Sequence, residues 1–461
     1  MEAKEKKNID MTKGPIAKAL FSFTIPILIG NIFQQFYAIA DTIIVGRTLG
    51  SNALAAVGST GTINFLVLGF ALGIASGFAV VTSQKFGAED EKGIRQSVSN
   101  GIMLLVLICA VMTAVSTLSM RKILIIMNTP DDIFMGAYTY IMIICAGLTA
   151  TVFYNLFAGF LRAVGNSRVP LYFLLLSSAL NIILDLVFII CFSWGIAGAA
   201  IATVFSQLVS AIGSLIYIVL KEKILVPRKE EWRLQRDIAN VQLYIGVPMA
   251  LQYAITASGT MVMQSAINIF GSVAVASFSA GAKCSSLFTS VFNSIGQSIP
   301  TFVGQNYGKG DLNRINKGVK VASIFTVVYG ILAGILVVVL LPYEIRLFVA
   351  DASEVASMLP WAKIYLIESA LFYVPLGFIF IYRNSMQAYG SSMAALIAGV
   401  VEMVTRVVCA IIAMITQNYA VAVFCDSAAW FTGAVYVVIA YIFAMRKLRS
   451  TMPEATAENI K

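Results

Sequence analysis

The stretch 25–47 constrains the fold of this chain most, because it is long and apolar enough to cross a bilayer as one helix. It contains Pro26, which removes a backbone hydrogen bond and bends a helix, and one acid, Asp41. An acid inside a membrane helix costs ~2.5–3.5 kcal/mol, so it normally faces a cavity or a partner. Tyr37 lies one turn before Asp41 on the same face. The pattern predicts a kinked helix that presents Tyr37 and Asp41 to an internal cavity, with Pro26 as its conformational hinge.

Composition indicates a polytopic membrane protein built from helices. Of the 461 residues 59% are hydrophobic and only 12% are charged, with a mean hydropathy of +0.85, whereas a soluble domain carries about 25% charged residues. The net charge of +9 therefore calls for a membrane explanation, and no nucleic-acid partner is expected. The chain has no histidine and no glycine-rich phosphate loop, which argues against an enzyme and against a cofactor. The six cysteines lie in apolar runs and are predicted to pack as small hydrophobic residues.

Apolar runs divide the chain into about twelve predicted spans. Their approximate limits are 18–46, 53–83, 96–119, 134–161, 169–191, 195–220, 242–270, 272–304, 318–341, 359–382, 392–416 and 420–445. With the N-terminus placed in the cytoplasm, 25 of the 32 Lys and Arg residues lie in cytoplasmic segments and two lie within spans. The remaining five, in outer loops, are Arg47, Arg121, Lys122, Arg346 and Lys363. This bias predicts that both termini are cytoplasmic.

The two halves of the chain resemble each other. The matched positions, at offsets of 221 to 225 residues, are Pro26 with Pro248, 84–87 with 305–308, and 162–167 with 387–392. We therefore predict a six-helix lobe at 1–220, a basic cytoplasmic linker at 221–241, a second six-helix lobe at 242–450 and a polar cytoplasmic tail at 451–461. Because each half has six spans, the repeat axis is expected along the membrane normal, an architecture suited to alternating access.

Several motifs together resemble the multidrug and toxic compound extrusion (MATE) family, in its prokaryotic branch. They are the Pro26 to Asp41 helix, the loop at 162–166, the segment from Asn181 to Asp185 and the segment 194–203. The resemblance implies efflux coupled to proton or sodium entry through a site in the N-terminal lobe. The residues that match that site are Tyr37, Asp41, Asn155, Asn181, Asp185 and Thr203. The repeat equivalent of Asp41 is Met263, so the acid of the first helix is not duplicated.

Helix geometry brings the two N-terminal acids to a common depth. Asp41 lies six residues before Arg47, and Asp185 lies nine residues before Trp194. At about 1.5 Å per residue, both acids are roughly 9–14 Å below the outer surface. Two carboxylates with nearby amide and hydroxyl oxygens can bind a sodium ion or share a proton. The predicted ligands of such a sodium ion are Asp41, Asn181, Asp185 and Thr203. The alternative to an ion site is that each acid is hydrogen-bonded separately to the end of a helix.

Other polar residues fall within the predicted spans. Glu402 and Arg406 lie four apart and can pair with each other, while Asp426 has no partner nearby in sequence. The remaining candidates for lining a substrate cavity are Gln34, Met263, Lys283 and Glu368.

These observations predict a secondary active exporter of amphipathic, cationic organic compounds that exchanges them for H⁺ or Na⁺ by alternating access. It is expected as a monomer among the lipids of a prokaryotic cell membrane, with small organic cations as its partners. The first alternative is a flippase for lipid-linked oligosaccharides, a class with more spans and a cationic cavity. A sugar facilitator would carry a charged motif between spans two and three, where this chain has Gln84–Gly93. A membrane-embedded enzyme lacks a poised nucleophile here, and a receptor would not need the internal repeat.

Overall fold

The computed structural model describes residues 8–127, 129–344 and 352–451. In these ranges the regular secondary structure consists of helices. Arg346 and residues 452–461 of the predicted tail lie outside these ranges. The helices of the first half are α1 (Ile16–Leu49), α2 (Ser51–Ser59), α3 (Gly61–Gly87), α4 (Glu91–Ile126), α5 (Asp131–Ala146), α6 (Leu148–Ala163), α7 (Arg168–Leu186), the π-helix η1 (Val187–Cys191) and α8 (Gly195–Lys221). Those of the second half are α9 (Arg236–Asn268), α10 (Ser272–Gly308), α11 (Leu312–Glu344), α12 (Ala352–Leu371), α13 (Tyr373–Ala388), α14 (Ser392–Thr416) and α15 (Tyr419–Thr451).

The helices account for the twelve predicted spans. In the described ranges nine helical segments are long and apolar enough to cross a membrane, and two bent helix pairs raise the number to eleven. The twelfth span is α10. Its 37 residues are more than long enough to cross a membrane, but many serines and Lys283 make it less apolar than the other spans. The prediction of an all-α polytopic membrane protein is confirmed.

Three predicted spans are interrupted. The span 134–161 bends by 45° at Gly147, and the span 359–382 bends by 48° at Phe372. A β-carbon on Gly147 would lie 2.3 Å from Cγ1 of Val204, so the first break allows α8 to approach closely. The span 53–83 is likewise divided, at Thr60 between α2 and α3.

The chain forms two compact units. Residues 8–11 and Ile25–Tyr253 belong to the N-terminal unit, and Thr12–Thr24 with 254–451 belong to the C-terminal unit. The division therefore falls within α9, whereas the sequence suggested the linker 221–241 as the boundary. The difference arises because the first half of α9 packs against α3.

The packing of α3 on α9 depends on glycine. A β-carbon on Gly77 would lie 2.4 Å from Cα of Gly246, and one on Gly73 would lie 2.6 Å from Cα of Ala250. Without side chains at these positions the two backbones touch directly, which is how small residues four apart join membrane helices. This contact holds the first half of α9 in the N-terminal unit.

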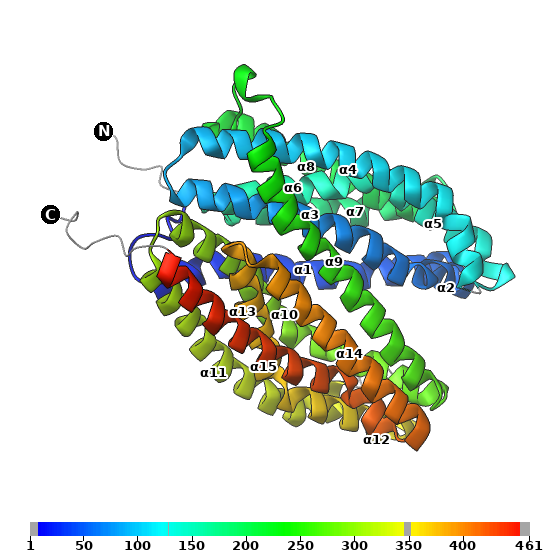
Figure 1. Cartoon of the computed structure of the whole chain (residues 1–461). Coiled ribbons are helices and arrows are strands. Elements are labelled where there is room, and N and C mark those ends of the chain that lie inside the picture. Colours follow the sequence, from blue (N-terminus) through cyan, green and yellow to red (C-terminus); the bar gives the residue numbers. More distant parts are fainter. Residues whose placement is uncertain (1–7, 128, 345–351, 452–461) are drawn as a thin grey trace. The chain divides into compact units, whose positions relative to one another are not determined.

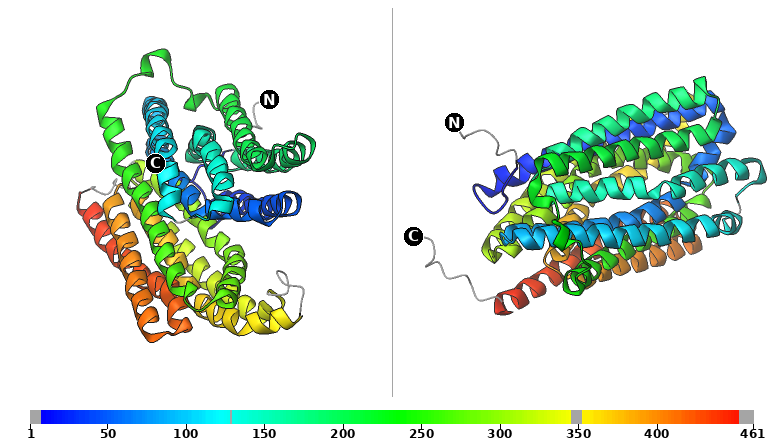
Figure 2. Two further views of the ribbon diagram at one scale, coloured as in Figure 1. Left: turned by 90° about the vertical axis from the view of Figure 1, so that its right-hand side faces the viewer. Right: turned by 90° about the horizontal axis from the view of Figure 1, so that it is seen from above.

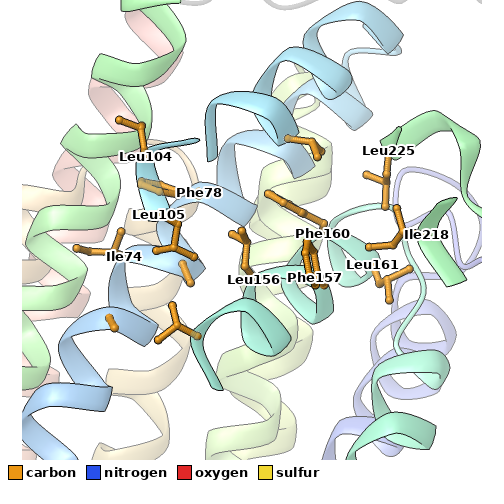
Figure 3. Packing of buried hydrophobic residues seen from close by; sticks show 14 of the residues in the cluster. Ile74, Phe78, Leu104, Leu105, Leu156, Phe157, Phe160, Leu161, Ile218 and Leu225 are labelled. Carbon is orange, nitrogen blue, oxygen red and sulfur yellow. The ribbon is translucent and has the colours of Figure 1, made fainter. Parts of the chain in front are cut away.

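The interior of the N-terminal unit is filled by large apolar side chains from α3, α4 and α6 (Figure 3). Phe78, Leu105 and Phe160 are completely buried there. Ile218 of α8 and Leu225, just beyond that helix, extend the same cluster to the end of the bundle. The long helices of the unit run beside one another, so each spanning helix has one face covered by its neighbours (Figure 1).

The linker is held against α4 by polar contacts. It leaves α8 and returns to α9 outside the helical bundle (Figure 2). Nε of Arg95 donates to both carboxylate oxygens of Glu231 at 3.0 Å, and the Ser99 hydroxyl donates to the Glu231 carbonyl at 2.8 Å. Arg95 and Glu231 are both buried, so this pair anchors the linker to the start of α4.

The linker anchor leads to a pH-dependent prediction. Burial raises the pKa of the Glu231 carboxyl, but hydrogen bonds from the Arg228 backbone and the Arg95 side chain outweigh it, so the net pKa lies below its ordinary value. The carboxylate therefore stabilises the fold above its unfolded pKa, and this contribution is lost as the pH falls through the folded pKa. Glu231→Gln should lower Tm at about pH 7, by an amount corresponding to ~1–3 kcal/mol, and the difference from wild type should vanish in acid. Thermal unfolding of the purified protein at a series of pH values measures this. Equal differences from wild type at all pH values would contradict it.

Candidate functional site

Asp41 and Asp185 meet inside the N-terminal unit. Asp41 lies on α1 and Asp185 near the end of α7, and their carboxyl groups are close enough to interact electrostatically. The helices approach closely because α1 has a glycine at position 30, where a β-carbon would lie 2.9 Å from the side chain of Leu174 on α7. Two carboxylates in one buried site repel each other, and this repulsion is relieved when one of them binds a proton or when a cation binds between them.

The carboxyl pair is largely removed from solvent. The Asp185 side chain is fully buried, and Oδ1 of Asp41 is buried with no donor among the described residues. A carboxylate oxygen in this situation is costly unless a proton or a cation reaches it. The π-helix Val187–Cys191 begins two residues after Asp185, and such local widening of a helix is common at functional sites.

Asn181 and Thr203 place further oxygen atoms on the same side of α7. Asn181 lies one turn before Asp185 and is buried, and its amide donates to Oγ1 of Thr203 on α8 at 3.3 Å. The Thr203 hydroxyl in turn donates to the Ala199 carbonyl at 3.1 Å. These bonds orient both side chains and join α7 to α8 beside the carboxyl pair.

Two tyrosines lie beside the carboxyl groups. Tyr37 on α1 is close enough to interact electrostatically with Asp41 and Asp185, as the sequence suggested. Tyr140 on α5 is buried and interacts electrostatically with the same two acids and with Tyr37. Sequence reasoning missed Tyr140, because a single tyrosine in an apolar helix carries no signal that separates it from other tyrosines in the spans.

Asn155 is placed differently from the other candidates that the family resemblance suggested. It lies on α6, where its side-chain amide donates to the Thr151 carbonyl one turn earlier in the same helix at 2.8 Å. This hydrogen bond holds the Asn155 side chain along its own helix.

The candidate cavity residues are distributed over both units. Gln34 is exposed on α1, Met263 is buried on α9, and Lys283 is exposed on α10. Glu368 is half-buried on α12, with Tyr419 as an electrostatic neighbour.

The C-terminal unit holds a buried network of four charges. Nη1 of Arg383 donates to Glu402 at 3.1 Å, and Nε of Arg406 donates to Asp426 at 2.7 Å. Glu402 and Arg406 are 3.8 Å apart, so the predicted pair exists but is the middle of a longer chain. Arg383 lies within α13, which continues through it to Ala388, and it is buried. Asp426 gains its partner across helices, where local sequence spacing could not show it.

The family model MatE matches this chain in two segments, residues 26–187 and 248–412. Each segment covers most of one half of the chain, in agreement with the internal repeat. Together they extend over more than half of the protein.

Known proteins of similar sequence and structure support the match. A probable multidrug resistance protein of Bacillus subtilis, YpnP, is 29% identical over 399 residues, which cover 86% of this chain and 88% of YpnP. An FAD transporter of Shewanella oneidensis is 25% identical over 402 residues, which cover 86% and 87% of the two chains. A multidrug resistance MATE transporter of the MOP superfamily, solved in an outward-facing conformation, superposes with a TM-score of 0.90 at 22% identity and covers 97% of this chain and 99% of its own. The chain belongs to the MATE family of membrane transporters.

Proposed function

We propose that this protein exports amphipathic organic cations in exchange for H⁺ or Na⁺. The observation that carries the proposal is the buried contact between Asp41 and Asp185 on α1 and α7. Similarity to proteins named for multidrug resistance supports the export of small organic molecules. The carboxyl pair supports the part of the proposal that concerns cations.

In this mechanism the carboxyl pair alternates between two charge states. With one shared proton the pair has a single negative charge and attracts a cation. A second proton, or a sodium ion held by carboxylate, amide and hydroxyl oxygens, neutralises the pair and displaces an organic cation. Asn181 and Thr203 provide the additional oxygens.

The remaining predictions about the protein in its membrane belong to the same proposal. Both termini face the cytoplasm of a prokaryotic cell, and the protein works as a monomer surrounded by lipid. Pro26, buried inside α1, lets the outer half of that helix bend as the carboxyl pair binds and releases ions.

The experiment is efflux of a fluorescent organic cation from proteoliposomes. A pH gradient alone and a sodium gradient alone are imposed on separate samples, and Pro26→Ala is compared with wild type. We expect one gradient to drive efflux, and Pro26→Ala to transport more slowly. If neither gradient drives efflux of any of several organic cations, the proposed function is wrong.

A second candidate substrate is suggested by the similarity to an FAD transporter, whose substrate is large and anionic. Efflux from the same vesicles loaded with FAD distinguishes this candidate substrate from organic cations. Cation-coupled release of FAD without release of organic cations would replace the proposed substrate class.

A further inference from the structure

The two halves of the chain can be compared residue by residue from α6 to α7 and from α13 to α14. Gly165 and Gly390, which both adopt positive φ (88° and 92°), lie 225 residues apart. The bounds of α6 (Leu148–Ala163) and α13 (Tyr373–Ala388) differ by the same 225 at both ends, as do the ends of the two MatE matches, residues 187 and 412. A residue of α7 therefore corresponds to the residue of α14 that lies 225 positions later.

This register matches Asn181 of the candidate ion site, and the residue one turn before it, with two members of the buried charge network. Asn181 corresponds to Arg406, and Ser177, one turn earlier, corresponds to Glu402. In the N-terminal unit the Asn181 amide bonds to α8 through Thr203, and in the C-terminal unit Arg406 bonds to α15, the equivalent helix, through Asp426. Both units thus join equivalent pairs of helices by a polar contact that starts from the same position, Asn181 or Arg406, and is neutral in one unit and charged in the other.

The charges of the C-terminal network balance one another. Two guanidinium groups, of Arg383 and Arg406, face two carboxylates, of Glu402 and Asp426, and the exposed fractions of the four side chains lie between 4% and 14%. Without the Arg406 side chain, Asp426 would lose its ion-pair partner and Glu402 would keep only Arg383. A carboxylate buried in this way binds whatever cation can reach it.

The surrounding backbone is shaped to hold the Arg406 side chain. A β-carbon on Gly259 of α9 would lie 3.1 Å from Cδ of Arg406, and one on Gly433 of α15 would lie 2.8 Å from Cγ of Glu402. Nη1 of Arg406 is buried and has no hydrogen-bond acceptor within the described ranges. Gly259 therefore leaves room for the Arg406 side chain, and Gly433 leaves room for Glu402 beside it.

We propose that Arg406 is a built-in cation, fixed in the C-terminal unit at the position that corresponds to Asn181 of the candidate ion site. Because an arginine side chain stays protonated, Glu402 and Asp426 are permanently neutralised and this pair of acids takes up no coupling ion. The contrast with a coupling site in the N-terminal unit rests on the proposed function, but the occupancy of the C-terminal site by Arg406 does not. Removing the side chain should convert the site into one that binds a free cation of the guanidinium class.

The test is chemical rescue of the variant Arg406→Ala in the purified full-length protein. The variant should unfold about 5–10 °C below wild type, because it leaves a buried acid unpaired. Millimolar methylguanidinium should restore much of this loss in Arg406→Ala and leave wild type unchanged, while tetramethylammonium at equal ionic strength, which has no N–H to donate to Asp426, should restore none. The measurement is repeated in Arg406→Ala with Asp41→Asn, where rescue should persist even if the proposed function fails.

A charge-balanced variant keeps the proposal testable if Arg406→Ala does not fold. The double variant Arg406→Ala with Asp426→Asn has no uncompensated acid from this pair, so it should be more stable than Arg406→Ala and should not respond to methylguanidinium. If the double variant is as unstable as the single one, the loss comes from packing and the proposal is overturned. Absence of rescue in a folded Arg406→Ala protein would overturn it as well.

Discussion

Asp41→Asn and Asp185→Asn are each expected to reduce coupled cation efflux about ten- to a hundredfold while leaving the protein folded. Asparagine keeps the shape of the side chain and removes the charge, so one charge-assisted contact with the coupling ion, ~1.5–3 kcal/mol, is lost. The measurement is the initial rate of efflux from proteoliposomes with equal amounts of inserted protein under the same gradient.

The matched control for these variants is Asp132→Asn. Asp132 is an exposed acid in the first turn of α5, so removing its charge tests for general effects of charge on the gradient or on insertion. It should transport at the wild-type rate. Wild-type efflux by both Asp41→Asn and Asp185→Asn would show that the carboxyl pair does not couple transport.

The second large effect, a loss of folding stability, is expected from substitutions where α3 crosses α9. At Gly77 a β-carbon would lie 2.4 Å from the backbone of Gly246, which has no flexible side chain to move aside. Gly77→Ala should therefore destabilise the N-terminal unit by at least ~1–3 kcal/mol, and Gly77→Leu should prevent recovery of folded protein. Thermal unfolding in detergent, with size-exclusion profiles for recovery, measures both.

Gly61→Ala is the control in the same helix. Nothing lies within 4 Å of a β-carbon at Gly61, and alanine has the higher helix propensity, so this variant should be neutral or slightly stabilised. If Gly77→Ala were as stable as Gly61→Ala, the close contact of α3 with α9 would have no part in stability.

The sequence predicted well those features that depend on one helix at a time or on the repeat. Twelve spans followed from apolar runs, and a common depth for Asp41 and Asp185 followed from the rise of a helix, since each acid lies at a countable distance from its helix end. Most of the other residues proposed for that site came from the family resemblance. Of these, Asn155 bonds within its own helix, which residue type alone could not reveal.

Features that depend on contacts between helices were missed. Tyr140 on α5 lies beside acids on α1 and α7, and Gly147 lies against Val204 of α8, far away in sequence. The charge network showed only its local pair, four residues apart, because Arg383 and Asp426 lie 19 and 20 residues from their partners. Spacing within a helix reveals neighbours one turn apart, and nothing in the spacing reveals a partner on the next helix.

The buried charge network also affects how the chain enters the membrane during synthesis. α13 brings Arg383 to the translocon before Glu402 has been made, and a lone charge in a membrane helix costs up to ~2.5–3.5 kcal/mol. α14 carries opposite charges one turn apart, and α15 brings the acid that completes the balance. The free energy of insertion is therefore most favourable when the last three helices insert together. We expect α13 to insert stably only after Asp426 has been synthesised.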